Sequence, residues 1–173
     1  MLYVDLTLPN QGKHVMTPTT FHSSDNFWKI LKNEAIDVAA KEPMLSSYIH
    51  ACVIKHHNFE SALSFILSNK VSDDVMPAIA VREIFDEAYL LNPAMVESAI
   101  IDIQAVLSRD PAVSSYLTVL IHFKGFHALQ IHRLANYLWH KDRTDLSLFI
   151  QSRNSIASGV DIHPAAVIGK GVM

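Results

Sequence analysis

The chain has 173 residues, of which 50% are hydrophobic, with a formal net charge of −3, a pI near 6.3 and a mean hydropathy of +0.19. This length allows a substantial core, in one domain or in one domain with an appendage. The weak negative charge argues against nucleic acid as a partner, whereas the rich apolar supply indicates faces that contact other subunits.

The sequence indicates a cytoplasmic protein. It has no uninterrupted apolar stretch of the about 20 residues that a membrane span needs, and it does not start with a basic-then-apolar secretory leader. We therefore expect no membrane partner. The single cysteine, Cys52, lies in the apolar run 48–54, which is typical of a small buried group rather than of a nucleophile.

Residues 1–24 lack helical periodicity and carry Pro9, Gly12 and Pro18, so we expect an irregular N-terminal extension with at most a short strand near Leu2. From residue 25 to residue 158, apolar residues recur every three or four positions, which predicts an all-helical domain. The expected helices begin near Asp25, after Pro43, after the cap residue Asn58, near Pro77, at Asn92-Pro93, at Phe126 and near Thr144.

After Gly159 the pattern changes to two hexapeptides, 162–167 and 168–173, each with a branched aliphatic residue in first position. This spacing is typical of a parallel β-helix, in which each repeat forms one side of a triangular coil. We therefore expect residues 159–173 to begin such a coil. Two hexapeptides lack stacked neighbours, so residues 160–173 are expected to be poorly ordered, or ordered only by another chain.

Four stretches carry a specific combination of residues: 76–83, 102–106 with 109–113, 124–130, and 161–166 followed by 168–171. In this order and spacing they resemble the serine acetyltransferase family, over about residues 25–173. The resemblance implies a mainly α fold. An all-helical N-terminal domain, 25–158, would be followed by the start of a left-handed parallel β-helix.

The resemblance also implies an activity. The enzyme would transfer the acetyl group of the co-substrate acetyl-CoA to the hydroxyl of L-serine, giving O-acetylserine for cysteine biosynthesis, with no bound cofactor. Family members are homo-oligomers, trimers through the β-helix and mostly hexamers through the helical domains. L-cysteine is a feedback inhibitor, and O-acetylserine sulfhydrylase binds a C-terminal tail.

One departure from the family concerns the catalytic base. In the family, the glycine motif matched by residues 169–173 runs directly into Leu-Asp-His, whose histidine is the base, and later coils line the acetyl-CoA cleft. The sequence stops at Met173. We therefore expect a truncated chain that is inactive alone and that holds no cofactor-binding residue.

Two carboxylates of this chain correspond to site residues of the family. Asp161 would be the partner of the histidine beyond Met173, holding its tautomer and stabilising the imidazolium. Asp110 would bind the ammonium of serine, with Pro111 shaping the same wall. Asp161 as a simple turn residue, and Asp110 as the end of a helix before a proline, remain alternatives.

A metal site is not expected. Ten histidines are present, but His122, His127 and His132 recur every five residues and so do not share a helix face. Two other functions compete with the serine acetyltransferase interpretation. One is a hexapeptide-repeat acyltransferase that acts on a sugar or an antibiotic, and the other is a non-catalytic helical oligomerisation module.

Overall fold

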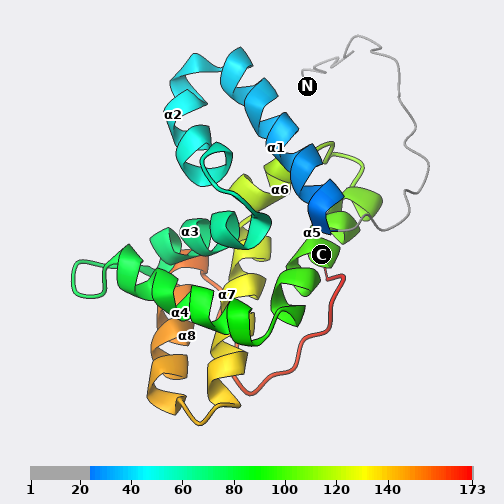
Figure 1. Cartoon of the computed structure of the whole chain (residues 1–173). Coiled ribbons are helices and arrows are strands. Elements are labelled where there is room, and N and C mark those ends of the chain that lie inside the picture. Colours follow the sequence, from blue (N-terminus) through cyan, green and yellow to red (C-terminus); the bar gives the residue numbers. More distant parts are fainter. Residues whose placement is uncertain (1–23, 173) are drawn as a thin grey trace, which may run out of the picture.

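The computed structural model describes residues 24–172 (Figure 1). The irregular extension expected over residues 1–24, with its strand near Leu2, lies outside the described residues except for Ser24, which begins α1 instead. The described part contains helices α1 (Ser24–Lys41), α2 (Ser46–Ile49), α3 (Phe59–Val71), α4 (Ala78–Leu91), α5 (Ala94–Arg109), α6 (Tyr116–His122), α7 (Lys124–Trp139) and α8 (Thr144–Ser158). A 3-10 turn, η1 (Pro43–Leu45), precedes α2, and a π-helical turn, η2 (His50–Ile54), follows it.

The seven helical stretches expected from apolar periodicity are confirmed. Their limits follow from local chemistry: the Asn58 side chain accepts a hydrogen bond from the Ser61 backbone N–H at 3.1 Å and so caps α3. At the other end of the domain, Gly159 has a φ of 71° and terminates α8. Such a left-handed cap favours glycine because a Cβ would clash with the backbone.

Helix α6 was not expected from the sequence. It has only seven residues, too few for a periodic apolar stripe to stand out. Its start is nevertheless well defined, because the Ser115 side chain accepts from the Thr118 N–H and the Glu34 carboxylate accepts from the Leu117 N–H. The Glu34 contact comes from α1, so tertiary structure supports this short helix.

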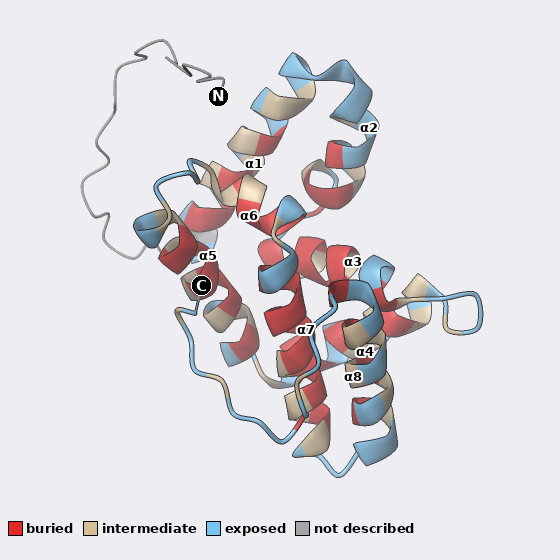
Figure 2. Ribbon diagram, turned by 180° about the vertical axis from the view of Figure 1, so that it is seen from behind, coloured by how far each residue is buried: buried red, intermediate tan, exposed pale blue. Residues whose placement is uncertain are grey.

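Two helical pairs dominate the packing, α7 with α8 and α3 with α4 (Figure 1). Helix α7 is buried along most of its length (Figure 2). Its polar side chains therefore need internal partners. His127 binds the Leu120 carbonyl at 2.7 Å, and Gln130 donates to Asp102 at 2.8 Å. His127 thus has a structural role in the packing of α7 against α6.

Acidification is expected to destabilise the fold, because burial lowers the pKa of His127 from 6.5 to about 4. The unfolded chain takes up this proton near pH 6.5, whereas the folded chain resists it. The contribution of His127 is therefore complete above pH 6.5 and is lost as the pH falls toward 4, by up to about 1.4 kcal/mol per pH unit. The free energy of unfolding of residues 1–173, measured in urea between about pH 4.5 and 7, would show this slope.

The matched variant is His127→Gln, whose amide can donate to Leu120 but does not titrate. Its slope should be smaller. It should not vanish, because burial also lowers the pKa values of His56 and His132. Equal slopes for the two proteins would contradict the assignment to His127.

Within residues 24–172, no single helix is both long and apolar enough to cross a membrane. Helices α4 and α5 pass such a test only when taken together, and the chain bends by 98° between them.

The segment 159–172 differs from our expectation in two respects. It forms no strand in the part of the chain that the structure describes, so the start of a β-helix is not shown. Our expectation that residues 160–173 would be poorly ordered or held only by another chain is wrong for 160–172. These residues lie against α5, α7 and α8 of the same chain. Side chains of α5 and α7 bind the backbone of the segment, and Gln151 of α8 binds the Asp161 side chain.

Candidate functional site: the segment after α8 and the end of α5

The segment 159–172 runs from the end of α8 past α7 and reaches α5 (Figure 1). Near its start, the Asp161 carboxylate accepts a hydrogen bond from Gln151 Nε2 of α8 at 2.7 Å. The His163 ring then contacts Trp139 at the end of α7, with ring centroids 5.0 Å apart. The segment therefore crosses the α7–α8 pair before it reaches α5.

Two consecutive turns of α7 hold the middle of this segment. Asn136 Nδ2 donates to the carbonyls of Pro164 and Ala166, at 2.7 and 3.2 Å. His132 Nε2 donates to the Ala166 carbonyl at 2.9 Å, and burial lowers the pKa of this histidine. A neutral imidazole with its proton on Nε2 satisfies the contact.

Asp110 is the C-cap of α5 and is followed by Pro111. The residue before a proline avoids the α region, and Asp110 accordingly has an extended backbone with φ −99° and ψ 106°. Its Oδ1 accepts from the Ala112 N–H at 2.9 Å, as in an Asx turn. Oδ2 makes no hydrogen bond to any described residue. The helix-ending turn is therefore present, and it leaves one carboxylate oxygen for a ligand.

Asp161 is exposed and its hydrogen bond to Gln151 comes from a side chain, so it differs from a turn residue that binds backbone N–H groups. The two predicted carboxylates lie at opposite ends of the segment. Asp161 lies against α8, whereas Asp110 adjoins Arg109, which binds Gly171 at 2.7 Å.

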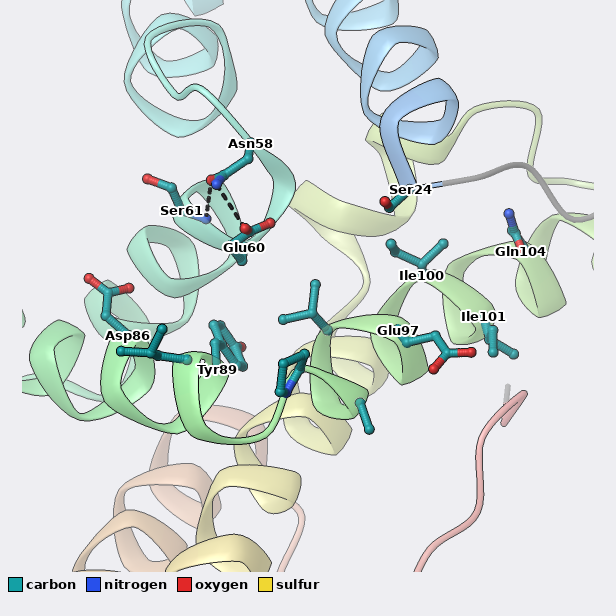
Figure 3. Close-up of a pocket in the computed structure, with 14 residues that line it drawn as sticks. Ser24, Asn58, Glu60, Ser61, Asp86, Tyr89, Glu97, Ile100, Ile101 and Gln104 are labelled. Carbon is teal, nitrogen blue, oxygen red and sulfur yellow. Dashed lines mark hydrogen bonds between the residues drawn. The ribbon is translucent and has the colours of Figure 1, made fainter.

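A large open groove of about 990 Å³ lies elsewhere, among α3, α4, α5 and the start of α1 (Figure 3). Its walls combine apolar side chains with the carboxylates of Glu60, Asp86 and Glu97. Neither Asp110 nor Asp161 lines it. The groove is therefore separate from the predicted site residues.

The three histidines that were expected not to share a helix face lie in different surroundings on α6 and α7. His122 is exposed, while His127 and His132 are buried and bind two different carbonyls. Among residues 24–172, no group of three or more His, Cys, Asp or Glu side chains is placed to hold a metal ion.

Sequence reasoning missed Asp102 and Arg133 as site residues. Asp102 is buried, and the Arg133 guanidinium lies 2.7 Å from its Oδ2. A signal was available, because Asp102 stands between two isoleucines on a helix that faces the core. A carboxylate in such a place requires buried donors, although the sequence does not say where they come from.

Fold and site together define a helical domain whose side chains bind the segment that follows it. An exposed carboxylate, Asp161, lies near the start of that segment, and the half-buried Asp110 follows Arg109, which binds its end. The family model described as "Serine acetyltransferase, N-terminal" matches residues 27–131. The serine acetyltransferase of Salmonella typhimurium is 53% identical over 146 residues, which cover 84% of this chain and 54% of that protein.

Solved structures agree with these matches. A serine acetyltransferase in complex with CoA aligns with a TM-score of 0.86 at 47% identity, over 87% of this chain and 64% of that one. A serine acetyltransferase in complex with cysteine aligns with a TM-score of 0.84 at 47% identity, over 86% of this chain and 62% of that one. The chain therefore belongs to the serine acetyltransferase family. It spans about half the length of the curated relatives it matches.

Proposed function

We propose that the complete protein is a serine O-acetyltransferase, which transfers the acetyl group of acetyl-CoA to the hydroxyl of L-serine and forms O-acetylserine for cysteine biosynthesis. The observation that carries this proposal is the 53% identity to a serine acetyltransferase over 84% of the chain. The proposal includes a cytoplasmic location. It also includes binding of O-acetylserine sulfhydrylase through a C-terminal tail, as the family resemblance implies.

The proposed substrates and inhibitor are acetyl-CoA, L-serine and L-cysteine. A relative solved with CoA supports acetyl-CoA as co-substrate, and a relative solved with cysteine supports feedback inhibition. Serine and cysteine share an ammonium and a carboxylate, so one site can recognise both through the same charged contacts.

In this proposal, Asp110 binds the substrate ammonium and Pro111 shapes the adjoining wall. The Asx turn supports this role, because it orients the Asp110 carboxylate and leaves Oδ2 without a partner among the described residues. Asp161 would be the carboxylate that orients a catalytic histidine following Met173. Its exposure and its single amide contact leave it accessible to such a partner.

A thiol-release assay with acetyl-CoA and L-serine tests the proposed activity. We expect the complete protein to release CoA only when serine is present. A protein limited to residues 1–173 should be inactive, because the residues described here pair no histidine with Asp161 or Asp110. A complete protein that acetylates a sugar or an antibiotic amine, but not serine, would overturn the proposal. Activity of residues 1–173 alone would show that the base lies within them.

We further propose that the complete protein is a homo-oligomer, trimeric through a left-handed β-helix that begins with residues 159–173, and hexameric through its helical domains. Exposed apolar side chains support helical contacts between chains. On α4, Leu90 and Leu91 form an exposed apolar patch at the end of the helix, and Ile79 is exposed near its start. Exposed apolar side chains of this kind are unfavourable in water and favour association.

Residues 1–173 are accordingly expected to form dimers or larger species at micromolar concentration. Light scattering with size-exclusion chromatography measures this directly. The variant Leu90→Glu, which places a charge on the patch, should shift the population toward the monomer. A wild-type chain that is monomeric throughout the micromolar range would contradict the expectation.

A further inference from the structure

Gly171 is bound to α5 through both of its peptide groups. Its N–H donates to Asp102 Oδ1 at 2.7 Å, and its carbonyl accepts from Arg109 Nη1 at 2.7 Å. Asp102 and Arg109 are two helical turns apart and share a face of α5. Gly171 has a φ of 77°, a left-handed conformation that favours glycine. The backbone at the end of the segment is therefore held at a fixed position along α5, by Asp102 and Arg109.

Asp102 connects this contact to the core. Its side chain is 1% exposed, and it accepts four hydrogen bonds. Oδ1 accepts from the N–H groups of Gly171 and Val172, at 2.7 and 3.1 Å. Oδ2 accepts from Gln130 Nε2 and Arg133 Nη2 of α7, at 2.8 and 2.7 Å. Four donors match the acceptor capacity of an ionised carboxylate, so its buried charge is fully satisfied.

Arg133 continues the same network to the middle of the segment. Its guanidinium donates to the carbonyls of Ile168 and Gly169, at 3.1 and 2.8 Å, while it pairs with Asp102. Planar guanidinium geometry makes these contacts together, which a lysine ammonium on its flexible stem does not reproduce. One buried ion pair therefore binds four residues of the segment, Ile168, Gly169, Gly171 and Val172.

We infer that Asp102 and Arg133 are positioning residues for the serine site. The inference rests on the proposed function and on the role of Asp110 within it. Asp110 directly follows Arg109 at the end of α5, so whatever fixes residues 168–172 on α5 also fixes their distance from the Asp110 carboxylate. A displacement of about 1 Å in such a site lowers catalytic efficiency by up to about 100-fold. Asp102 and Arg133 contact the backbone and are not expected to touch serine.

Arg133→Lys tests the inference in the complete protein, and Arg153→Lys is its matched control. Arg153 has the same chemistry at another place: it pairs with Asp73 at 3.3 Å and donates to the carbonyls of Val71 and Ser72, both at 2.9 Å. It joins α8 to the loop after α3, away from residues 168–172. Both variants should lose thermal stability.

Only Arg133→Lys should also lose serine kcat/KM, by about 10-fold or more, with the KM for acetyl-CoA within about twofold of wild type. If the role of Arg133 is only structural, both variants should be less stable than the wild type, and their serine kcat/KM values should be the same. If serine kcat/KM of Arg133→Lys stays within about twofold of Arg153→Lys, the inference is overturned.

Amide exchange provides a readout that does not depend on activity. Asp102→Asn keeps the shape of the side chain but replaces one acceptor oxygen with an NH2 donor. In one orientation this NH2 group meets the donors of Gln130 and Arg133, and in the other it meets the N–H groups of Gly171 and Val172. The N–H groups of Gly171 and Val172 should exchange faster in Asp102→Asn and in Arg133→Lys, and at the wild-type rate in Arg153→Lys. Unchanged exchange at these two amides would show that Asp102 and Arg133 do not hold residues 168–172 in place.

If Asp102→Asn does not fold, Arg133→Lys alone decides the outcome. A wild-type complete protein that does not acetylate serine would refute the proposed function, and with it the serine site. The exchange rates would then still decide whether Asp102 and Arg133 hold the segment.

Discussion

Asp110→Asn is expected to raise the serine KM of the complete protein by about 10- to 100-fold, because it removes a charged hydrogen-bond acceptor for the substrate ammonium. A hydrogen bond to a charged group contributes about 1.5–3 kcal/mol, and about 1.4 kcal/mol corresponds to a factor of ten. Inhibition by L-cysteine should weaken by a similar factor, since cysteine carries the same ammonium. Binding of acetyl-CoA should change little.

Asparagine is the informative substitution because it separates the two roles of Asp110. Its side-chain oxygen can still accept from the Ala112 N–H, so the turn before Pro111 is kept and the fold should be unaffected. Asp110→Ala removes the turn contact as well and should add a loss of stability. Steady-state kinetics with serine varied, and inhibition curves with cysteine, measure these effects.

Asp73→Asn is the matched control. Asp73 also accepts backbone N–H groups in a turn, from Val75 and Met76 at 2.9 and 2.7 Å, but it lies in the loop between α3 and α4. Its serine KM should equal that of the wild type. Wild-type serine kinetics and wild-type cysteine sensitivity in Asp110→Asn would show that Asp110 only terminates α5.

Leu134→Ala is expected to lower the free energy of unfolding by about 2–5 kcal/mol, the range for a leucine truncated in a packed core. Leu134 is 0% exposed and lies in α7, the helix most enclosed by the others. The loss combines fewer buried methyl groups with a cavity that the surrounding helices fill only in part. For a chain of this size, the melting temperature should fall by roughly 5–20 °C.

Ile156→Ala removes the same number of carbon atoms on the surface of α8, where the side chain is 69% exposed and lies outside the proposed α4 patch. It should alter the free energy of unfolding by at most about 0.5 kcal/mol. Urea titrations of residues 1–173 carrying each substitution provide the comparison. Equal destabilisation by the two changes would mean that α7 is not the centre of the core.

Much of the helical domain follows from local sequence. The stripe Phe27, Leu31 and Ala35 repeats at helical spacing, and all three residues are buried in α1. Asn58 caps α3 as its residue type predicts, since a short side chain with an acceptor can reach the third N–H of a helix. Helix α6 was not predicted in this way, because it is short and is supported by a contact from Glu34 of α1.

For the candidate site, the sequence by itself determined the residue types and the family resemblance, which singled out Asp110 before Pro111 and Asp161. It did not single out the carboxylate of Asp102, which the structure places on the buried face of α5. Only the tertiary structure decided what that carboxylate binds. Gly171 lies 69 positions further along the chain and Arg133 lies 31 positions further. Periodicity and caps report contacts within a few residues, whereas a buried charge is satisfied by whatever donors the packed helices bring to it.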